Sequence, residues 1–283
     1  MTKLNHTMVL RLAEGALAED QARNDITTAA LVPQGQEGRA VIVAKVEGVL
    51  AGMPVAEATF AAVDGALAWH AQRGDGERIA ENDCVATIEG SIASILCAER
   101  VALNFLSHLS GIATVTNAVV WALEGTRCRL RDTRKTTPGL RALEKYAVRV
   151  GGGTNHRMDL ADGVLIKDNH LAALRRRRLG IADAIRLARE ALPAMRIEVE
   201  VTTVEEAREG LAAGADELLL DNMSLGAMKE VVEMANRAAV LEASGGITLA
   251  NTQGVAETGV DYISMGAITH SAAALDLSLD LGA

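Results

Sequence analysis

Five basic side chains stand close together in the middle of the chain, beside segments that are expected to form strands. These are Arg134, Lys135, His156, Arg157 and Lys167. They occur among small and polar residues rather than on a helix face, so we expect them to gather at the ends of strands. Such a group of cations needs an anion to balance it. The chemistry that it suggests is the binding of a small molecule with several negative charges.

Two acidic side chains lie at or near the ends of successive predicted strands. Glu200 belongs to the strand expected over residues 197–201, and Asp221 ends the strand expected over residues 217–221. Two carboxylates that converge at one edge suit Mg²⁺, which is commonly held by one or two carboxylates together with substrate phosphates. The alternative remains that these acids cap the following helices or pair with Lys167.

Two loops rich in small residues follow the last two predicted strands. Small side chains let backbone N–H groups approach an anion closely, and a helix N-terminus adds partial positive charge. Phosphate sites in α/β barrels often lie after the last two strands. The candidate phosphate-binding residues of these loops are Ser244, Gly245, Gly246, Ser264, Gly266 and Ala267.

Short apolar runs alternate with segments of helical periodicity in the second part of the chain. Strands are expected over residues 129–132, 163–167, 197–201, 217–221, 239–243 and 261–265, and helices over residues 181–192, 204–213, 225–236 and 249–258. This alternation predicts parallel βαβ units, whose strands carry functional residues at their carboxyl ends. Because the strands fall short of eight, we expect an incomplete α/β barrel, with an open parallel sheet as the alternative.

The first part of the chain has a different pattern, typical of a smaller α+β domain. Strands are expected over residues 39–45 and 84–90, Asp25 resembles a helix cap, and two helices are expected over residues 94–124 with Gly111 at their junction. His108 is expected to be an ordinary helix histidine facing a neighbouring element. The predicted domains are residues 1–111 and 112–270, with the tail 271–283 packing back on the first.

The composition excludes several classes of partner. The chain has 283 residues, a formal net charge of -9, 49% hydrophobic residues and 2% aromatic residues. An acidic chain with few rings is poorly suited to nucleic acid. No apolar run approaches the length of a membrane span and no signal-peptide pattern is seen, so we expect a cytoplasmic protein without a membrane partner. Cys84, Cys97 and Cys128 are expected to be buried thiols rather than a disulfide framework or metal cluster.

The motifs also resemble those of a known family, the quinolinate phosphoribosyltransferases or nicotinate-nucleotide pyrophosphorylases (carboxylating). The similar segments are residues 99–106, 110–114, 133–141, 153–157, 165–170, 198–201, 220–222, 244–246 and 266–271. The resemblance implies an α/β protein with an N-terminal open sandwich and an incomplete barrel, the type II phosphoribosyltransferase fold. It also implies a pentosyltransferase that makes nicotinate mononucleotide, diphosphate and CO₂ from quinolinate and 5-phosphoribosyl-1-diphosphate in NAD biosynthesis.

The resemblance assigns roles to individual residues. It places Thr133 with the five basic residues in a pocket for quinolinate and diphosphate, and Glu200 and Asp221 near the ribose and Mg²⁺. Lys135 and Lys167 join these two acids as catalytic residues, and the two glycine-containing loops bind the 5′-phosphate. The resemblance further implies a homodimer, or a higher oligomer built from it, in which Arg100 enters the partner subunit's site. By its sequence context alone, Arg100 is an ordinary helix-surface arginine.

Some features depart from the family pattern or leave rival interpretations open. Thr202 and Thr203 stand where the family often has an acid, which puts a metal role for that position in doubt. The run Arg175–Arg178 is either a solvated segment or an electrostatic funnel for anionic substrates. The rivals are a related enzyme of molybdate gene clusters and a non-catalytic sensor that binds a phosphorylated metabolite.

Overall fold

The computed structural model describes residues 4–282 and divides them into two compact units. The first unit contains the chain up to Asn117, the segment Ala142–Gly152 and the chain from Ser271 onward. The second contains Ala118–Arg141 and Gly153–His270. This division differs from the predicted domains, which placed the boundary at residue 111 and assigned residues 142–152 to the barrel.

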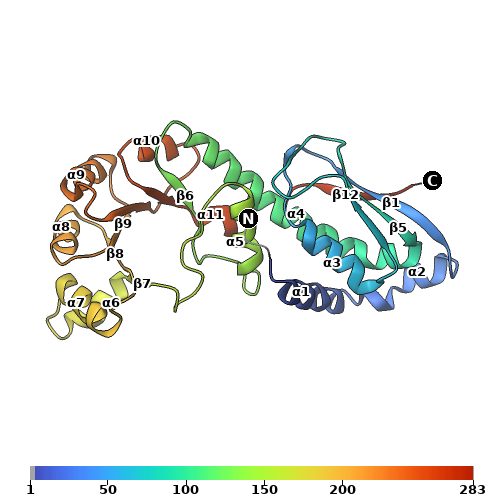
Figure 1. The fold of residues 1–283 in the computed structure, drawn as a ribbon, viewed down its shortest axis with the longest axis horizontal. Helices are drawn as coiled ribbons and strands as arrows, with labels where there is room; N and C mark the ends of the chain where they lie inside the picture. Colours follow the sequence, from blue (N-terminus) through green and yellow to red (C-terminus); the bar gives the residue numbers. More distant parts are fainter. Residues whose placement is uncertain (1–3, 283) are drawn as a thin grey trace. The chain divides into compact units, whose positions relative to one another are not determined.

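A four-stranded antiparallel sheet forms the centre of the first unit. Its order is β12 (Leu277–Leu281), β1 (Glu37–Ala44), β5 (Cys84–Ser91) and β3 (Ala68–Ala71). The C-terminal strand β12 lies beside β1, with Ala40 opposite Leu281 and Ala44 opposite Leu277 (Figure 1). Along β1, Ala40, Ile42 and Ala44 are fully buried, and they join one apolar core with residues of β5 and β12. The alternation of β1 therefore fixes which face of the sheet is covered.

Short helices and a two-stranded ribbon complete this unit. They are α1 (His6–Glu19), η1 (Ala22–Asn24), α2 (Ile26–Leu31), α3 (Met53–Val63), most of α5 (Arg141–Val150), β2 (Gly48–Val49) and β4 (Arg78–Ile79). The predicted cap at Asp25 is confirmed, because its carboxylate accepts hydrogen bonds from the backbone N–H groups of Thr27 and Thr28 at 2.9 and 3.0 Å.

The helix α4 (Ile92–Ala122) runs for 31 residues without interruption, so the predicted junction at Gly111 is wrong. The glycine serves a different purpose. A Cβ atom at position 111 would lie 2.0 Å from the carbonyl oxygen of Ala273 and 3.0 Å from its carbonyl carbon. Gly111 therefore lets the backbone of the C-terminal segment lie directly on the helix. Gly151 acts similarly, since its Cβ would lie 2.5 Å from the Ala113 oxygen, and this close packing explains why residues 142–152 belong to the first unit.

Length and composition alone would allow α4 to span a membrane, contrary to the expectation from the sequence. Its most apolar 18-residue window has a mean hydropathy of 1.3, and 44% of that window is buried. The core helix of a globular unit has the same properties. Ile95, Ala98, Ala102 and Leu106 are fully buried in the core beneath the antiparallel sheet, so the helix is needed by that core.

The structural prediction for His108 is confirmed, whereas that for the cysteines holds only in part. His108 Nε2 lies 2.9 Å from Oε1 of the buried Glu144 on α5, within the first unit. Cys128 is buried, and burial raises the pKa of its thiol to about 12. Cys84 and Cys97 are only half-buried, and all three cysteines are free.

A six-stranded parallel sheet forms the second unit. Its order is β6 (Arg129–Arg131), β11 (Tyr262–Ser264), β10 (Val240–Ser244), β9 (Glu217–Asp221), β8 (Ile197–Val201) and β7 (Val164–Ile166). The first strand in the chain lies beside the last, which is the neighbour relation of a barrel rather than of an open doubly wound sheet. Within residues 4–282 the edge strands β6 and β7 do not pair with one another. The predicted incomplete barrel is therefore confirmed.

The helices of this unit follow their strands, and α7, α8 and α9 lie along the outer side of the sheet (Figure 1). The helices are α6 (Asp168–Arg175), α7 (Ile181–Ala191), α8 (Val204–Ala212), α9 (Leu225–Ala235), α10 (Thr252–Ala256) and α11 (Ala267–His270). At the open edge, Thr154 forms a parallel bridge with Arg131, so an extended segment lies beside β6 where a closed barrel would have its next strand. This segment carries His156 and Arg157 to the interior.

We predict that Gly111→Ala destabilises the protein by about 3 kcal/mol, because its methyl group meets backbone atoms that cannot rotate away. Gly15→Ala is the matched control, since Gly15 is also a helix residue but has nothing within 4 Å of its Cβ position. The control should raise stability by about 0.5–1 kcal/mol. Urea denaturation of the two variants tests this, and equal stabilities would contradict the packing described for Gly111.

Candidate active site

Strand alternation places polar side chains on the inner face of the barrel sheet. On β8, Ile197, Val199 and Val201 are fully buried on one face, and Glu198 and Glu200 point to the other. The strands β9 and β10 alternate in the same way, with Asp221 and Ser244 at their carboxyl ends. Because the strands are parallel, these carboxyl ends meet at one edge of the sheet.

A cavity of about 660 Å³ lies at this edge, a volume typical of sites for small molecules. Its lining is mostly charged or polar. The lining residues are Thr133, Arg134, Lys135, His156, Arg157, Leu165, Lys167, Glu200, Leu219, Asp221, Asn222, Glu242, Ser244, Gly245, Gly246 and Ser264. The cavity thus collects all five basic residues and both acids that the sequence singled out.

Three of the residues selected from the sequence do not line the cavity. Gly266 and Ala267 lie at the start of α11, where a Cβ on Gly266 would come within 2.8 Å of Lys135 Cδ, so Gly266 makes room for the lysine stem. Arg100 lies on α4 in the first unit with 63% of its side chain exposed.

Two guanidinium groups of the cavity, those of Arg134 and Arg157, lie close enough for one charge to affect the other. The buried Nε of Arg134 has no hydrogen-bond partner in the described part of the chain. Burial and the positive charge of Arg134 both lower the pKa of Arg157, whose Nη1 donates to the Gly163 carbonyl oxygen at 2.9 Å. Repulsion between these guanidinium groups favours an anion that enters between them.

The two strand-end acids both line the cavity, and one carboxylate oxygen of each has a side-chain partner. Glu200 Oε2 lies 2.9 Å from Lys167 Nζ, so the ion pair considered from the sequence is present. Asp221 Oδ2 accepts a hydrogen bond from the Asn222 side chain at 2.8 Å. Thr202 and Thr203 do not extend this group, because Thr202 bonds to Glu206 and Thr203 caps α8.

The loop after β10 holds two successive glycines in left-handed conformations, with φ of 87° at Gly245 and 60° at Gly246. A Cβ on Gly245 would lie 2.4 Å from the Asn222 side chain. The backbone at position 245 therefore lies so close to the Asn222 side chain that only glycine, which has no Cβ, fits there. The expected helix does not follow at once, since α10 begins only at Thr252.

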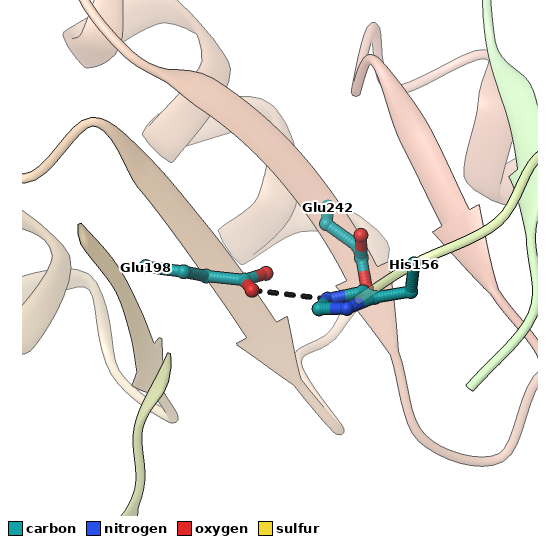
Figure 2. A group of neighbouring side chains, drawn as sticks. All are labelled: His156, Glu198 and Glu242. Carbon is teal, nitrogen blue, oxygen red and sulfur yellow. Dashed lines mark ion pairs between the residues drawn. The ribbon is translucent and has the colours of Figure 1, made fainter. Parts of the chain in front are cut away.

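A buried ionic network fills the interior below the cavity. Arg131 Nη1 donates to Glu217 Oε2 at 2.9 Å and to Glu242 Oε2 at 2.7 Å, and its guanidinium stacks on the Tyr262 ring. His156 Nε2 lies 3.0 Å from Glu198 Oε2 and 3.7 Å from Glu242 Oε1. Figure 2 shows the two acids reaching the imidazole from different sides. Glu242 is fully buried, and Glu198 and Glu217 are 6% and 7% exposed.

Two family models match the chain and together cover most of it. Residues 25–110 match the quinolinate phosphoribosyl transferase N-terminal domain, and residues 112–280 match the C-terminal domain. The chain belongs to the quinolinate phosphoribosyltransferase family.

Individual relatives match this family member over nearly their whole length. A Bacillus subtilis protein named probable nicotinate-nucleotide pyrophosphorylase (carboxylating) is 41% identical over 98% of this chain and 95% of its own. The Mycobacterium leprae nicotinate-nucleotide pyrophosphorylase (carboxylating) is 44% identical over 91% of each chain. The solved nicotinate-nucleotide pyrophosphorylase of Francisella tularensis is 38% identical, covers 99% of this chain and 98% of that chain, and superposes with a TM-score of 0.92.

Sequence reasoning missed several residues of this phosphoribosyltransferase site. Glu198 and Glu242 were expected only as parts of strands, although each stands two residues before a polar strand-end residue and must share its face. The alternation of side chains along each strand could therefore have identified both glutamates from the sequence. Asn222 has a positive φ of 53° and meets Gly245 in space, a contact that its sequence position next to Asp221 does not reveal.

We predict that Asp132→Ala destabilises this family member by about 3 kcal/mol, because it leaves buried donors unsatisfied. Asp132 is fully buried, and its carboxylate accepts hydrogen bonds from the His156 backbone N–H and the Asn155 side chain. In the control Asp159→Ala, the lost bond to the Ala161 N–H is exposed, and the loss should stay below about 1 kcal/mol. Thermal unfolding compares the two, and similar losses would show that Asp132 does not anchor the His156 segment.

Proposed function

We propose that this protein transfers the phosphoribosyl group of 5-phosphoribosyl-1-diphosphate to quinolinate and removes one carboxyl group as CO₂. The products are nicotinate mononucleotide and diphosphate. The observation that carries the proposal is one cavity in which five basic residues face two strand-end acids and a glycine loop. The basic residues suit the dicarboxylate and the diphosphate. The acids suit the ribose and its Mg²⁺, and the glycine loop suits the 5′-phosphate.

The basic side chains are suited to the acceptor and the leaving group. Arg134 and Arg157 present planar guanidinium groups, which hold carboxylates through paired hydrogen bonds. Lys135 and Lys167 are point charges on flexible stems, so they follow the charge that develops on the departing diphosphate. Thr133 lies beside them, with its Oγ1 accepting a hydrogen bond from the Lys135 N–H at 3.0 Å.

The acids and the glycine loop are suited to the donor. Glu200 and Asp221 would hold Mg²⁺ together with substrate oxygens, and their donor set of carboxylate oxygens at a wet cavity fits this ion. When bound, Mg²⁺ would offset the charge of the diphosphate. Ser244, Gly245, Gly246 and Ser264 would receive the 5′-phosphate, and the buried Ser264 Oγ has no hydrogen-bond partner within residues 4–282.

The reaction follows from this placement. Diphosphate leaves C1 of the ribose, positive charge develops there, and the quinolinate nitrogen attacks the same carbon. Glu200 and Asp221 stabilise the developing charge on the sugar by their position. The pyridinium ring that forms accepts the electron pair of the breaking C–C bond, CO₂ leaves from the ring 2-position, and a proton then takes its place.

Several other expectations stay predictions. They include entry of Arg100 into the site of a partner subunit, the homodimer that this requires, and a cytoplasmic location. The run Arg175–Arg178 starts at the end of α6, and Arg175 lies 3.9 Å from Glu206; none of the four lines the cavity. If this run acts as a funnel, it must attract anionic substrates from a distance through its positive charge. The sensor alternative is disfavoured because Glu200 and Asp221 would weaken simple anion binding.

The assignment is tested by incubating the purified protein with quinolinate, phosphoribosyl diphosphate and Mg²⁺ and following products by mass spectrometry. We expect nicotinate mononucleotide and CO₂ in equal amounts. Nicotinate serves as the matched acceptor control, since it lacks the carboxyl group that leaves, and should give little product. Absence of turnover with quinolinate would overturn the assignment and favour the molybdate-cluster relative or a sensor.

Gly245→Ala is predicted to weaken use of phosphoribosyl diphosphate, because its methyl group displaces Asn222 beside the expected phosphate. Gly214→Ala is the matched control, because Gly214 also has a positive φ, of 80°, but nothing lies within 4 Å of its Cβ position. Both variants should lose about 1–2 kcal/mol of stability through backbone strain. Only Gly245→Ala should raise KM for the donor, by about tenfold, equivalent to about 1.4 kcal/mol. An unchanged KM would remove this loop from the donor site.

A further inference from the structure

The His156 ring is hydrogen-bonded at both nitrogens in a way that defines its protonation. Nδ1 accepts a hydrogen bond from the backbone N–H of Arg157 at 2.7 Å. Nε2 lies 3.0 Å from Glu198 Oε2, which can only accept when ionised, so Nε2 is the protonated nitrogen. A neutral ring is therefore held in the tautomer that carries its hydrogen on Nε2. A second proton would have to enter at Nδ1 and break the bond from Arg157.

The charges around the ring favour that second proton. Three buried carboxylates, those of Glu198, Glu217 and Glu242, belong to this network. Arg131 pairs with Glu217 and Glu242, Arg196 pairs with Glu217, and the charge of Arg157 attracts Glu198. Oε1 of Glu198 and Oε1 of Glu242 are both buried and have no hydrogen-bond partner in the described chain. Glu242 thus keeps its Oε1 3.7 Å from Nε2, and its negative charge favours a protonated ring.

The titration of His156 depends on groups from every element around it. Burial lowers its pKa, but the hydrogen bond to Glu198 and the charges of Glu242 and Glu198 offset this, so the pKa is raised above its ordinary value. The charged groups that surround the ring or act on it through a contact are Glu198 on β8, Glu217 on β9, Glu242 on β10, Arg131 on β6, Asp132 at its backbone and Arg157 beside it. The charge of Arg131 lowers the pKa of His156, and the charges of Glu198 and Glu242 raise it.

A second hollow gives the ring a path for proton exchange that avoids the main cavity. It has a volume of about 200 Å³, and its lining includes Arg131, Glu198 and Glu217. His156 and Arg157 line both hollows. A proton can therefore reach the imidazole from water in the second hollow while an acceptor fills the first.

We propose that Glu242 is a positioning residue which, acting through His156, makes the site take up one proton together with its dianionic acceptor. When the acceptor enters, its negative charge draws a proton onto Nδ1, and the Arg157 N–H that had bonded to Nδ1 is released. Binding of the acceptor thus raises the pKa of His156 further and increases the fraction of the protein in which His156 is positively charged. This inference rests on the proposed function, since quinolinate is the acceptor concerned.

A bound metal ion is the competing use of these side chains, because the ligand atoms of His156, Glu198 and Glu242 lie within 4.8 Å of one another. Two contacts favour the proton. Nε2 already shares its hydrogen with Glu198, and the Arg131 guanidinium occupies Glu242 Oε2 at 2.7 Å. A cation brought to Glu242 would meet that guanidinium at close range.

The test measures quinolinate binding by titration calorimetry without the phosphoribosyl donor. Binding in two buffers of different ionisation enthalpy gives the number of protons taken up at each pH. The wild type should take up protons on binding at pH values between the pKa of His156 in the free protein and its pKa in the complex. Over this range, Kd should rise by up to about tenfold for each unit of increase in pH. Glu242→Gln lowers the pKa of His156, so uptake and the rise in Kd should both move to lower pH.

Glu217→Gln is the matched control, because Glu217 is buried and shares Arg131 with Glu242, whereas the acids that raise the pKa of His156 are Glu198 and Glu242. Its pH window should match the wild type. The inference is overturned if Glu242→Gln keeps the wild-type window, as it would if Glu242 already carried a proton, or if both variants shift alike. Failure of quinolinate to bind the wild type at any pH would instead overturn the proposed function. Thermal unfolding of each variant verifies that it is folded.

Discussion

The interior of the barrel unit depends on a balance of buried charges. Many α/β barrels fill this space with layers of branched apolar side chains, but here Arg131 lies between Glu217 and Glu242, and His156 lies between Glu198 and Glu242. Removing charges from water carries a large free-energy cost, which is offset only when each charge finds a partner. The positions of β6, β8, β9 and β10 relative to one another must therefore be kept, because each contributes one member of the network.

The same balance explains why the cavity above it can remain cationic. Three of the acids of the barrel interior, Glu198, Glu217 and Glu242, are engaged in the lower network, and Glu200 engages Lys167 at the strand ends. The buried Nε of Arg134 has no hydrogen-bond partner within residues 4–282, and the positive charge of Arg134 lowers the pKa of Arg157. An acceptor with two carboxylates would offset the repulsion between these two guanidinium groups. The buried ionic network therefore has mainly a structural role, and the cavity at the strand ends is where the charged substrate would bind.

Much of this arrangement could be predicted from the sequence, because it follows from local rules. Six short apolar runs gave the six barrel strands within a residue or two, and the polar residue at each strand end indicated where the cavity forms. Other features depend on contacts between distant segments. Gly111 looks like a helix end until Ala273 is placed against it, and Glu242 looks like an ordinary strand residue until His156 reaches it across the open edge of the barrel. Neither contact produces a periodic pattern in the sequence, so neither could be predicted from it.

The most direct test of the account is a crystal structure of the protein with quinolinate bound. The account predicts that the acceptor lies in the cavity of the barrel unit, with its carboxylates within hydrogen-bonding distance of the Arg134 and Arg157 guanidinium groups and its ring next to His156. Quinolinate bound elsewhere, or within the cavity but away from both arginines, would contradict the central claim that the neighbouring guanidinium groups of Arg134 and Arg157 form the acceptor site.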